Sequence, residues 1–295
     1  MQTQFVDSFV VVVECGSIAE AARRLNITAT ALAARVDALE TEFGQKLLIR
    51  SGRTVRATES GLRLAASAGT LQKALRELRS AVAGEQVPGV LRLGSISTAL
   101  SGWLPERLRR LCTRYPHVEL RLEAGVSRDL YHALQRDQLD IALVVAPPFA
   151  LPKSLVWRPV RREPLVVLAH RRHRSTDPLQ LLTTQPLIRY DRNNWGGSLA
   201  DQFLVSKRIR PKERAELDAL EALEVLVRLD MGVSLVPDWA RAHALSPDLV
   251  TLPLEDAPCR EIGLLWPGGS AHKDLAEMIA EGVGLAPIRD AAGFS

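Results

Sequence analysis

The strongest constraint on the fold is a change in hydrophobic spacing near residue 85. Before this point, apolar side chains recur every three or four residues, which is the spacing of one face of an α-helix. After it, short apolar runs typical of strands alternate with helical segments. The intervening segment from Gly84 to Gly89 contains Pro88 and is typical of a linker. We therefore expect a helical N-terminal part and an α/β C-terminal part.

Three helices are expected in the first part of the chain. The first ends at Gly16, and Ser17-Ile18-Ala19-Glu20 has the form of a capping box, in which a hydroxyl and a carboxylate each accept a free backbone N–H at a helix start. Asn26 closes this second helix, and Thr28 can cap a third helix that ends at Gly44. Two short helices joined by a turn of about four residues form a helix-turn-helix.

A basic segment follows the third helix. Between Lys46 and Thr58 there is no acidic residue, and Ser51-Gly52 lies at a turn position between apolar residues, which predicts a two-stranded wing. Such a segment can be no more than a solvated face. Directly after a helix-turn-helix, however, its charges lie where DNA phosphates would bind. The basic residues are Lys46, Arg50, Arg53 and Arg56.

A long helix is expected from Thr58 to about Ala83, because no proline interrupts the helical pattern there. Its apolar residues have heptad spacing, and a single seam of this kind needs a partner helix. A second copy of the same helix is the simplest partner, although the helix can also pack against the body of its own chain. The seam consists of Leu64, Ala68, Leu71, Leu75, Leu78 and Val82.

The C-terminal part alternates strands with helices. A strand at Val90–Ser95 is followed by a helix, and strands at Val118–Ala124 and Asp140–Val145 flank another helix. The pattern restarts after Pro164 with the apolar run Leu165–Ala169. Strands separated by helices of this length predict crossover connections and a largely parallel sheet, and the restart predicts two α/β lobes.

The chain resembles the LysR-type transcriptional regulator family over essentially its full length. The residues that carry the resemblance in the N-terminal part are Gly16-Ser17-Ile18, Ala21–Thr28, Ala31-Leu32, Leu39-Glu40, Glu42-Phe43-Gly44, Leu47-Leu48, Arg50, Arg53 and Thr58–Gly61. Later matches are Leu91–Gly94, Leu104-Pro105, Tyr115-Pro116, Leu139–Leu143 and Met231–Pro237. The resemblance implies a winged helix-turn-helix, a linker-helix dimer seam and a two-lobed effector domain similar to periplasmic binding proteins, commonly assembled as a tetramer.

These patterns set the expected domain boundaries. An all-α winged helix-turn-helix DNA-binding domain is expected at 1–58, with the helix-turn-helix itself at about 18–37. The linker or dimerisation helix and its hinge follow at 59–87. The α/β effector-binding domain is expected at 88–295, with one lobe formed by about 88–163 and 267–295 and the other by about 164–266.

The third helix departs from the family pattern. Where the family commonly begins its recognition helix Ser-Gln-Pro and later shows Ser-Arg, this chain has Thr28-Ala29-Thr30 and Ala33-Ala34, followed by Arg35. An alanine methyl can at most contact a thymine methyl, so the departure weakens base recognition. The expected DNA-contacting residues are Thr28, Ala29, Thr30, Ala31, Arg35, Arg50, Arg53 and Arg56.

Three loops can form an effector site, because ligands of α/β lobes bind where strands end and helix N-termini begin. They are Ser95–Thr98, Gly125–Ser127 and Asn194–Ser198. The resemblance places Ser97, Thr98 and Ser127 where relatives contact small molecules, with the Trp195–Ser198 loop facing them. The expected effector-binding residues are Ser97, Thr98, Ser127, Trp195 and Gly196.

Two questions stay open at these loops. The serines can be helix caps instead of ligand contacts, and Tyr190 can be a core residue or a contact. Helix N-termini and hydroxyls suit a carboxylate or phosphate, so an anionic effector is expected, with Arg192 adding charge and Trp195 a stacking face.

Composition excludes other classes of protein. With 46% hydrophobic and 24% charged residues the chain can form packed cores, and its net charge of +4 is mild. No histidine pair has metal-binding helical spacing, and no phosphate-binding glycine loop or nucleophile elbow is present, so we expect no enzyme, metal or cofactor. The apolar segments fall short of the roughly 20 residues that a membrane span needs, so a cytoplasmic protein is expected.

The three cysteines are too dispersed for a disulfide framework or a zinc site. A redox switch using Cys112 and Cys259 is conceivable, but isolated cysteines are more often small core residues.

The sequence thus predicts a sequence-specific DNA-binding transcriptional regulator, controlled by a small-molecule effector between two α/β lobes. Its expected partners are double-stranded DNA, the effector, and a second copy through the linker helix in a dimer or tetramer. RNA polymerase is a further candidate partner. The alternatives are an architectural DNA-binding protein with weak base readout and a solute-binding protein with a helical appendage.

Overall fold

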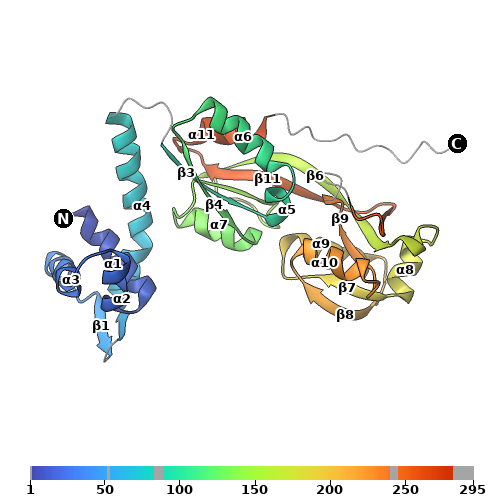
Figure 1. Ribbon diagram of the computed structural model, residues 1–295, viewed down its shortest axis with the longest axis horizontal. Coiled ribbons are helices and arrows are strands. Elements are labelled where there is room, and N and C mark those ends of the chain that lie inside the picture. Colours follow the sequence, from blue (N-terminus) through green and yellow to red (C-terminus); the bar gives the residue numbers. More distant parts are fainter. Residues whose placement is uncertain (1, 52–53, 83–88, 240–244, 282–295) are drawn as a thin grey trace. The chain divides into compact units, whose positions relative to one another are not determined.

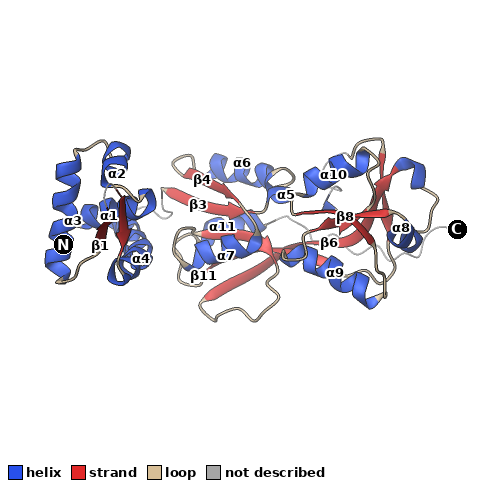
Figure 2. Cartoon of the chain, turned by 90° about the horizontal axis from the view of Figure 1, so that it is seen from below, coloured by secondary structure: helices blue, strands red, loops and turns tan. Residues whose placement is uncertain are grey.

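The computed structural model describes residues 2–51, 54–82, 89–239 and 245–281, which fall into two compact units. The N-terminal unit is mainly helical, and the C-terminal unit combines helices with strands (Figure 2). Figure 1 labels most of their elements.

The N-terminal unit is a winged helix-turn-helix followed by one long helix. Its elements are α1 (Thr3–Cys15), α2 (Ile18–Arg24), α3 (Ala29–Phe43), β1 (Leu48–Ser51), β2 (Thr54–Ala57) and α4 (Glu59–Val82). The wing strands β1 and β2 pair antiparallel. The fold expected for this part of the chain is confirmed.

The predicted caps explain where these helices begin and end. Gly16 ends α1 with a φ of 61°, and Asn26, with a φ of 53°, follows α2 in the same left-handed conformation. The Thr28 hydroxyl accepts a hydrogen bond from the Ala31 N–H at 3.1 Å and caps α3. The capping box at Ser17 is only half formed, because its hydroxyl accepts from the Glu20 N–H while the Glu20 carboxylate pairs with Arg23.

Glu40 of α3 anchors the wing. Its buried carboxylate accepts hydrogen bonds from the N–H groups of Leu47 at 2.9 Å and Leu48 at 3.2 Å, and it pairs with Lys46. Burial opposes ionisation, but these partners outweigh it and hold the pKa of Glu40 below its ordinary value.

The heptad seam of α4 divides into two parts. Ala68 is buried in the core of its own unit, and Leu64 and Leu71 pack against that core. This part of the seam therefore follows the alternative in which the helix packs against its own chain. Further along, Leu78 is 61% exposed, and the Val82 side chain lies outside the described part of the structure. A partner for the second part of the seam stays a prediction.

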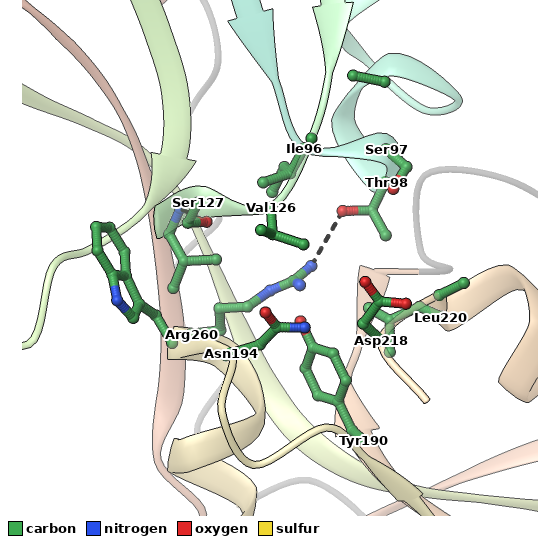
Figure 3. A pocket seen from close by; sticks show the side chains of 16 residues that line it. Ile96, Ser97, Thr98, Val126, Ser127, Tyr190, Asn194, Asp218, Leu220 and Arg260 are labelled. Atoms are coloured by element: carbon green, nitrogen blue, oxygen red, sulfur yellow. Dashed lines mark hydrogen bonds between the residues drawn. The ribbon is translucent and has the colours of Figure 1, made fainter. Parts of the chain in front are cut away.

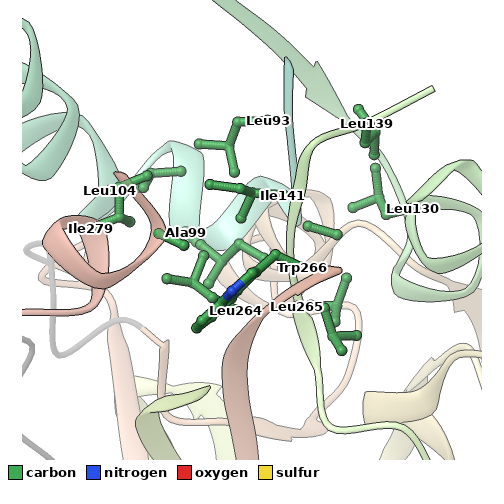
Figure 4. Close-up of a cluster of buried hydrophobic side chains, with 14 of the residues drawn as sticks. Leu93, Ala99, Leu104, Leu130, Leu139, Ile141, Leu264, Leu265, Trp266 and Ile279 are labelled. Atoms are coloured by element: carbon green, nitrogen blue, oxygen red, sulfur yellow. The ribbon is translucent and has the colours of Figure 1, made fainter. Parts of the chain in front are cut away.

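The first sheet of the C-terminal unit contains β3 (Val90–Ser95), β4 (Glu119–Ala124), β5 (Ile141–Val145), the first half of β6 (Leu155–His170) and β11 (Cys259–Pro267). Its helices α6 (Leu104–Arg114) and α11 (Lys273–Ala280) cover one face and α7 (Ser127–Gln135) the other, as Figure 1 shows. The short helix α5 (Ser97–Leu100) follows β3. Buried side chains from these elements meet around Trp266, which is 1% exposed (Figure 4).

The second lobe is built on the other half of β6, which pairs with β9 (Ser234–Pro237) and β10 (Leu249–Pro253). Beside it, β7 (Pro186–Tyr190) and β8 (Lys212–Leu217) form a separate parallel pair. The helical elements of this lobe are a 3₁₀ turn (Arg171–His173), α8 (Pro178–Thr184), α9 (Trp195–Ser206) and α10 (Leu220–Arg228).

The expectation of a largely parallel sheet is wrong. Among the paired strands of the described residues, β3 with β4, β3 with β5, and β7 with β8 run parallel. The long strands β6 and β11 instead pair antiparallel with each other and with their other neighbours. By this pairing β11 lies in the first sheet, whereas the expected boundary placed residues up to 266 in the second lobe.

A buried ion pair joins two of the motifs that carry the family resemblance. Asp140 is 1% exposed, and its carboxylate accepts hydrogen bonds from the Arg92 backbone N–H at 2.9 Å and from the Arg92 guanidinium at 2.7 Å and 3.1 Å. Burial opposes ionisation, but Arg92 and the nearby His272 outweigh it and hold the pKa of Asp140 below its ordinary value. This pair fixes β3 to the start of β5.

Two smaller expectations can also be compared with the structure. Cys112 is exposed and Cys15 and Cys259 are half-buried, so the expectation of core cysteines is wrong for Cys112. None of the helices among the described residues is both long and apolar enough to cross a membrane.

Candidate functional site

A cavity of about 240 Å³ lies between the two lobes of the C-terminal unit. The first lobe contributes the residues after β3 and the loop before α7, and the second lobe contributes the end of β7 and the starts of α9 and α10. All five expected effector-binding residues line it (Figure 3). The other lining residues are Ile96, Ala124, Gly125, Val126, Val145, Tyr190, Asn194, Asp218, Ala219, Leu220 and Arg260.

Three helices of eight or more residues begin at this cavity. Val126, Asn194 and Ala219 precede the first turns of α7, α9 and α10, and each accepts the first hydrogen bond of its helix through its carbonyl. The N–H groups of a first helical turn have no partner within their own helix and carry a partial positive charge. The cavity wall therefore favours a negatively charged group.

Arg260 is the only cationic side chain that lines the cavity among the described residues, and it is 1% exposed. Its guanidinium donates to Glu163 through Nε at 3.0 Å and through Nη2, and Nη2 also donates to the Thr98 hydroxyl at 3.3 Å. The Tyr190 hydroxyl is close enough to interact with the guanidinium electrostatically. Burial would lower the pKa of Arg260, but Glu163 and Tyr190 raise it on balance, so the guanidinium stays charged.

A side chain at the position of Gly196 would come too close to neighbouring residues. A Cβ atom at this position would lie 2.8 Å from the Tyr190 hydroxyl and 3.2 Å from Cδ of Arg260. At Gly197 it would lie only 1.9 Å from the Asp191 carbonyl oxygen. These two glycines let the first turn of α9 approach the cavity floor closely.

The serines are not helix caps in the sense considered from sequence. The Ser127 hydroxyl accepts from the Val145 N–H at 3.0 Å and so ties α7 to β5. Ser198 lies inside α9 and donates to the Trp195 carbonyl, because α9 begins three residues earlier than expected. Ser97 is exposed, and the residue before α5 provides no side-chain cap.

Trp195 and Arg192 differ from their expected roles. The Trp195 ring is 8% exposed and packs edge-on against Tyr131 at 6.0 Å and Phe149 at 5.6 Å, so it joins the lobes instead of offering an open stacking face. Arg192 pairs with Glu213 and Glu216 and does not line the cavity. Tyr190 is both buried in the core of the second lobe and part of the cavity wall.

Sequence reasoning missed Arg260 and Asp218. Arg260 and its partner Glu163 each lie two residues before an apolar run, at Ile262 and Leu165, and therefore on the same buried face of their strands. Continuing the alternation of buried and exposed positions two residues back along each strand would have placed both residues at buried positions. No comparable signal marks Asp218, which precedes α10 in an exposed loop.

The expected DNA-contacting residues are also partly placed by the structure. Thr28, Ala29, Thr30 and Ala31 are exposed at the start of α3, and Arg56 is exposed on the wing. Arg53 and the side chain of Arg50 lie outside the described residues.

Arg35 has a role within the fold. Its guanidinium donates to the Ser8 hydroxyl of α1 at 2.8 Å and lies 5.9 Å from the centre of the Phe5 ring. The side chain is therefore held against α1.

The chain matches two family profiles, "Bacterial regulatory helix-turn-helix protein, lysR family" over residues 4–62 and "LysR substrate binding domain" over residues 84–283. It is 27% identical over 245 residues to the transcriptional regulator CzcR of Bacillus anthracis, covering 82% of each chain. It is 29% identical over 292 residues to the regulator IlvR of Caulobacter vibrioides, covering 92% of this chain and 94% of that one. The structure superposes on a full-length OxyR variant from Pseudomonas aeruginosa with a TM-score of 0.71 at 23% identity, covering 96% and 94% of the two chains.

The two profiles together span the helix-turn-helix and almost all of the α/β unit that contains the cavity. The chain therefore belongs to the LysR family of bacterial transcriptional regulators, with a DNA-binding helix-turn-helix and an effector-binding domain.

Proposed function

We propose that a small molecule with a carboxylate binds in the cavity between the lobes and controls DNA binding by this regulator. The observation that carries the proposal is the meeting of three helix N-termini and the buried Arg260 guanidinium at one cavity. Ser97, Thr98, Ser127, Trp195 and Gly196 also line the cavity. The protein acts in the cytoplasm through binding, without a catalytic step.

The lobes are linked at the cavity by contacts that a ligand can strengthen or break. The Ser101 hydroxyl donates to Glu221 at 3.1 Å, and Arg128 donates to the Asn193 carbonyl at 2.8 Å. The Trp195 ring contacts the first lobe beside them. In our proposal, a bound effector favours one placement of the lobes by population shift and so alters packing between subunits.

Subunit pairing then transmits the change to DNA. We propose a dimer through the exposed second part of the α4 seam, where Leu78 offers an apolar surface. Two such dimers would form a tetramer that presents paired helix-turn-helix units to an operator, with RNA polymerase as a candidate partner. Freezing the lobes with an inter-lobe crosslink should abolish the effector response, and an unchanged response would contradict this mechanism.

The effector site is tested with a library of small carboxylates and neutral compounds, screened by thermal shift on the full-length protein. We expect carboxylates to raise the melting temperature and Thr98→Val to reduce their effect, since valine removes the hydroxyl that holds Arg260. Thr183→Val is the matched control, because the Thr183 hydroxyl donates to the Gln180 carbonyl within α8, away from the cavity. Shifts from neutral compounds alone would overturn the proposal of an anionic effector.

One observation favours a second candidate function, an architectural DNA-binding protein. The exposed start of α3 carries Ala29, Thr30 and Ala31, which offer methyl groups and one hydroxyl for reading bases, and the Arg35 guanidinium is bound to α1. Selection from randomised duplex DNA separates the two. An enriched inverted repeat supports the sequence-specific regulator, with Thr28, Thr30 and Arg56 as proposed contacts. Binding without sequence preference, falling steeply with salt, would support the architectural candidate.

A further inference from the structure

The cavity carries a negative charge as well as a positive one. The Asp218 carboxylate lies on its wall, immediately before α10, and is exposed. Within the described part of the chain this carboxylate has no hydrogen-bond or ion-pair partner. Figure 3 shows its side chain on the same cavity as Thr98 and the Arg260 guanidinium. An unpaired carboxylate on a cavity wall repels a simple anion and attracts a cation.

The part of the cavity wall around Arg260 keeps an excess of positive charge. Glu163 lies between two guanidinium groups, because Arg161 approaches its other oxygen at 3.0 Å while Arg260 binds the first. Two cations and one carboxylate leave this buried group with one net positive charge. The first turns of α7 and α9 add their partial positive charges. The cavity wall therefore carries groups that attract ligand charges of both signs.

We propose that the effector is a small zwitterion, with a carboxylate held by Arg260, Thr98 and the helix N-termini, and a primary ammonium group held by Asp218. This inference rests on the proposed function, because it assigns a ligand class to the same cavity. Amino acids are the common small molecules with both groups.

The apolar part of the wall limits the rest of the ligand. Ile96, Val126, Val145 and Leu220 line the same cavity as the charged groups. A cavity of about 240 Å³ has room for a ligand of this size with a short aliphatic side chain. A second charge on that side chain would meet the apolar wall, where burying it is costly. The geometry thus points to a small aliphatic amino acid.

A structural role for Asp218 predicts different contacts. An acidic residue before a helix is often favourable because it accepts N–H groups of the first turn or interacts with the helix dipole. Ala219 is the residue that precedes α10, and no side chain caps this helix. Such a role would affect stability but would not distinguish a ligand with an ammonium group from the same ligand without one.

The experiment is a calorimetric titration of the full-length protein with matched probes. L-valine and 5-aminopentanoate carry both charges at two different separations, 3-methylbutanoate carries only the carboxylate, and isobutylamine carries only the ammonium. The remaining proteinogenic amino acids complete the panel. Each probe is titrated into the wild type, Asp218→Asn, and the control Glu255→Gln. Glu255 is an exposed carboxylate that does not line the cavity, so the control removes the same charge elsewhere.

We expect at least one amino acid to bind the wild type about 10-fold or more tightly than its analogue without the amino group, as a charge-assisted hydrogen bond allows. Asp218→Asn should remove that advantage and leave the affinity for the carboxylate analogue unchanged or higher. Glu255→Gln should behave like the wild type.

Three results would overturn the inference, and they separate it from the proposed function. If carboxylates bind the wild type as tightly as the matched amino acids, or if Asp218→Asn weakens both classes equally, the cavity binds anions and only the zwitterion is wrong. If no probe in the panel binds, the zwitterion is again wrong, and the carboxylate library decides the proposed function. If only uncharged compounds bind, both proposals fail.

Discussion

Glu163→Gln tests whether the buried charge pair supports the cavity floor. Glu163 is 3% exposed and Arg260 is 1% exposed, and the carboxylate accepts two hydrogen bonds from that guanidinium. Glutamine has nearly the same shape but leaves the Arg260 charge without a counter-ion. Breaking a buried ion pair in this way costs roughly 3–5 kcal/mol, and we expect the lower end because the amide oxygen still accepts a hydrogen bond.

For a domain of the size of the matched region 84–283, a loss of about 3 kcal/mol lowers the melting temperature by roughly 6–12 °C. Thermal unfolding followed by circular dichroism measures the shift. The control is Glu106→Gln, whose exposed carboxylate pairs with Arg109 and Arg110 at the surface and should leave the melting temperature unchanged. The same Glu163→Gln protein should bind a carboxylate probe more tightly, since the cavity floor gains positive charge. A shift of less than about 2 °C together with unchanged carboxylate affinity would refute the reasoning.

Three further predictions follow from other contacts. The free energy of unfolding should fall as the pH drops below about 4, because the pKa of Asp140 is lower in the folded protein than in the unfolded chain, and protonation of this carboxylate removes the stability that it provides. Asp140→Asn, measured by urea unfolding between pH 2 and 7, should flatten this pH dependence. An equally steep loss of stability in the variant would contradict the prediction. Arg35→Ala should lower the stability of the N-terminal unit by about 1 kcal/mol, because the hydrogen bond to Ser8 is lost. Selection from randomised DNA should return the same sequence preference for this variant as for the wild type. A changed preference would show that Arg35 contacts bases. Gly197→Ala should destabilise the second lobe, because the added Cβ would overlap a backbone oxygen. Gly269→Ala should not, because its added Cβ would have no other atom within 4 Å. Equal melting temperatures of the two variants would contradict this prediction.

The N-terminal unit could be predicted almost completely because its boundaries are set by local interactions. A glycine at Gly16, a left-handed Asn26 and a capping hydroxyl at Thr28 each act within a few residues of their own position. Periodicity alone then identifies the buried faces. What periodicity did not reveal is which surface each face packs against, and the seam of α4 illustrates this, because Ala68 is buried in its own unit.

The C-terminal unit was predicted less completely for a physical reason. The first half of β6 carries Arg158, Arg161, Arg162 and Glu163, which interrupt the apolar pattern of a buried strand. Those charges are satisfied by residues from distant parts of the chain, such as Glu261 for Arg162. The three loops that line the cavity could be predicted because each follows a strand. Arg260 was missed because its partners Glu163 and Thr98 are 97 and 162 residues away in sequence, and only the alternation along its strand marks it as a buried position.

The position of the charged pair connects ligand binding to the arrangement of the lobes. Arg260 lies near the start of β11, and Glu163 lies on β6 next to Pro164, where this strand leaves the first sheet. From Leu165 onward β6 pairs with β9 and β10 of the second lobe. A ligand carboxylate that binds Arg260 therefore acts on the strand that joins the two sheets. Thr98 of the first lobe accepts a hydrogen bond from the same guanidinium, and Tyr190 of the second lobe lines the cavity beside it, so a displacement of Arg260 would alter its surroundings in both lobes. In our proposal, the guanidinium that binds the ligand is thus also the group through which the lobes respond to it.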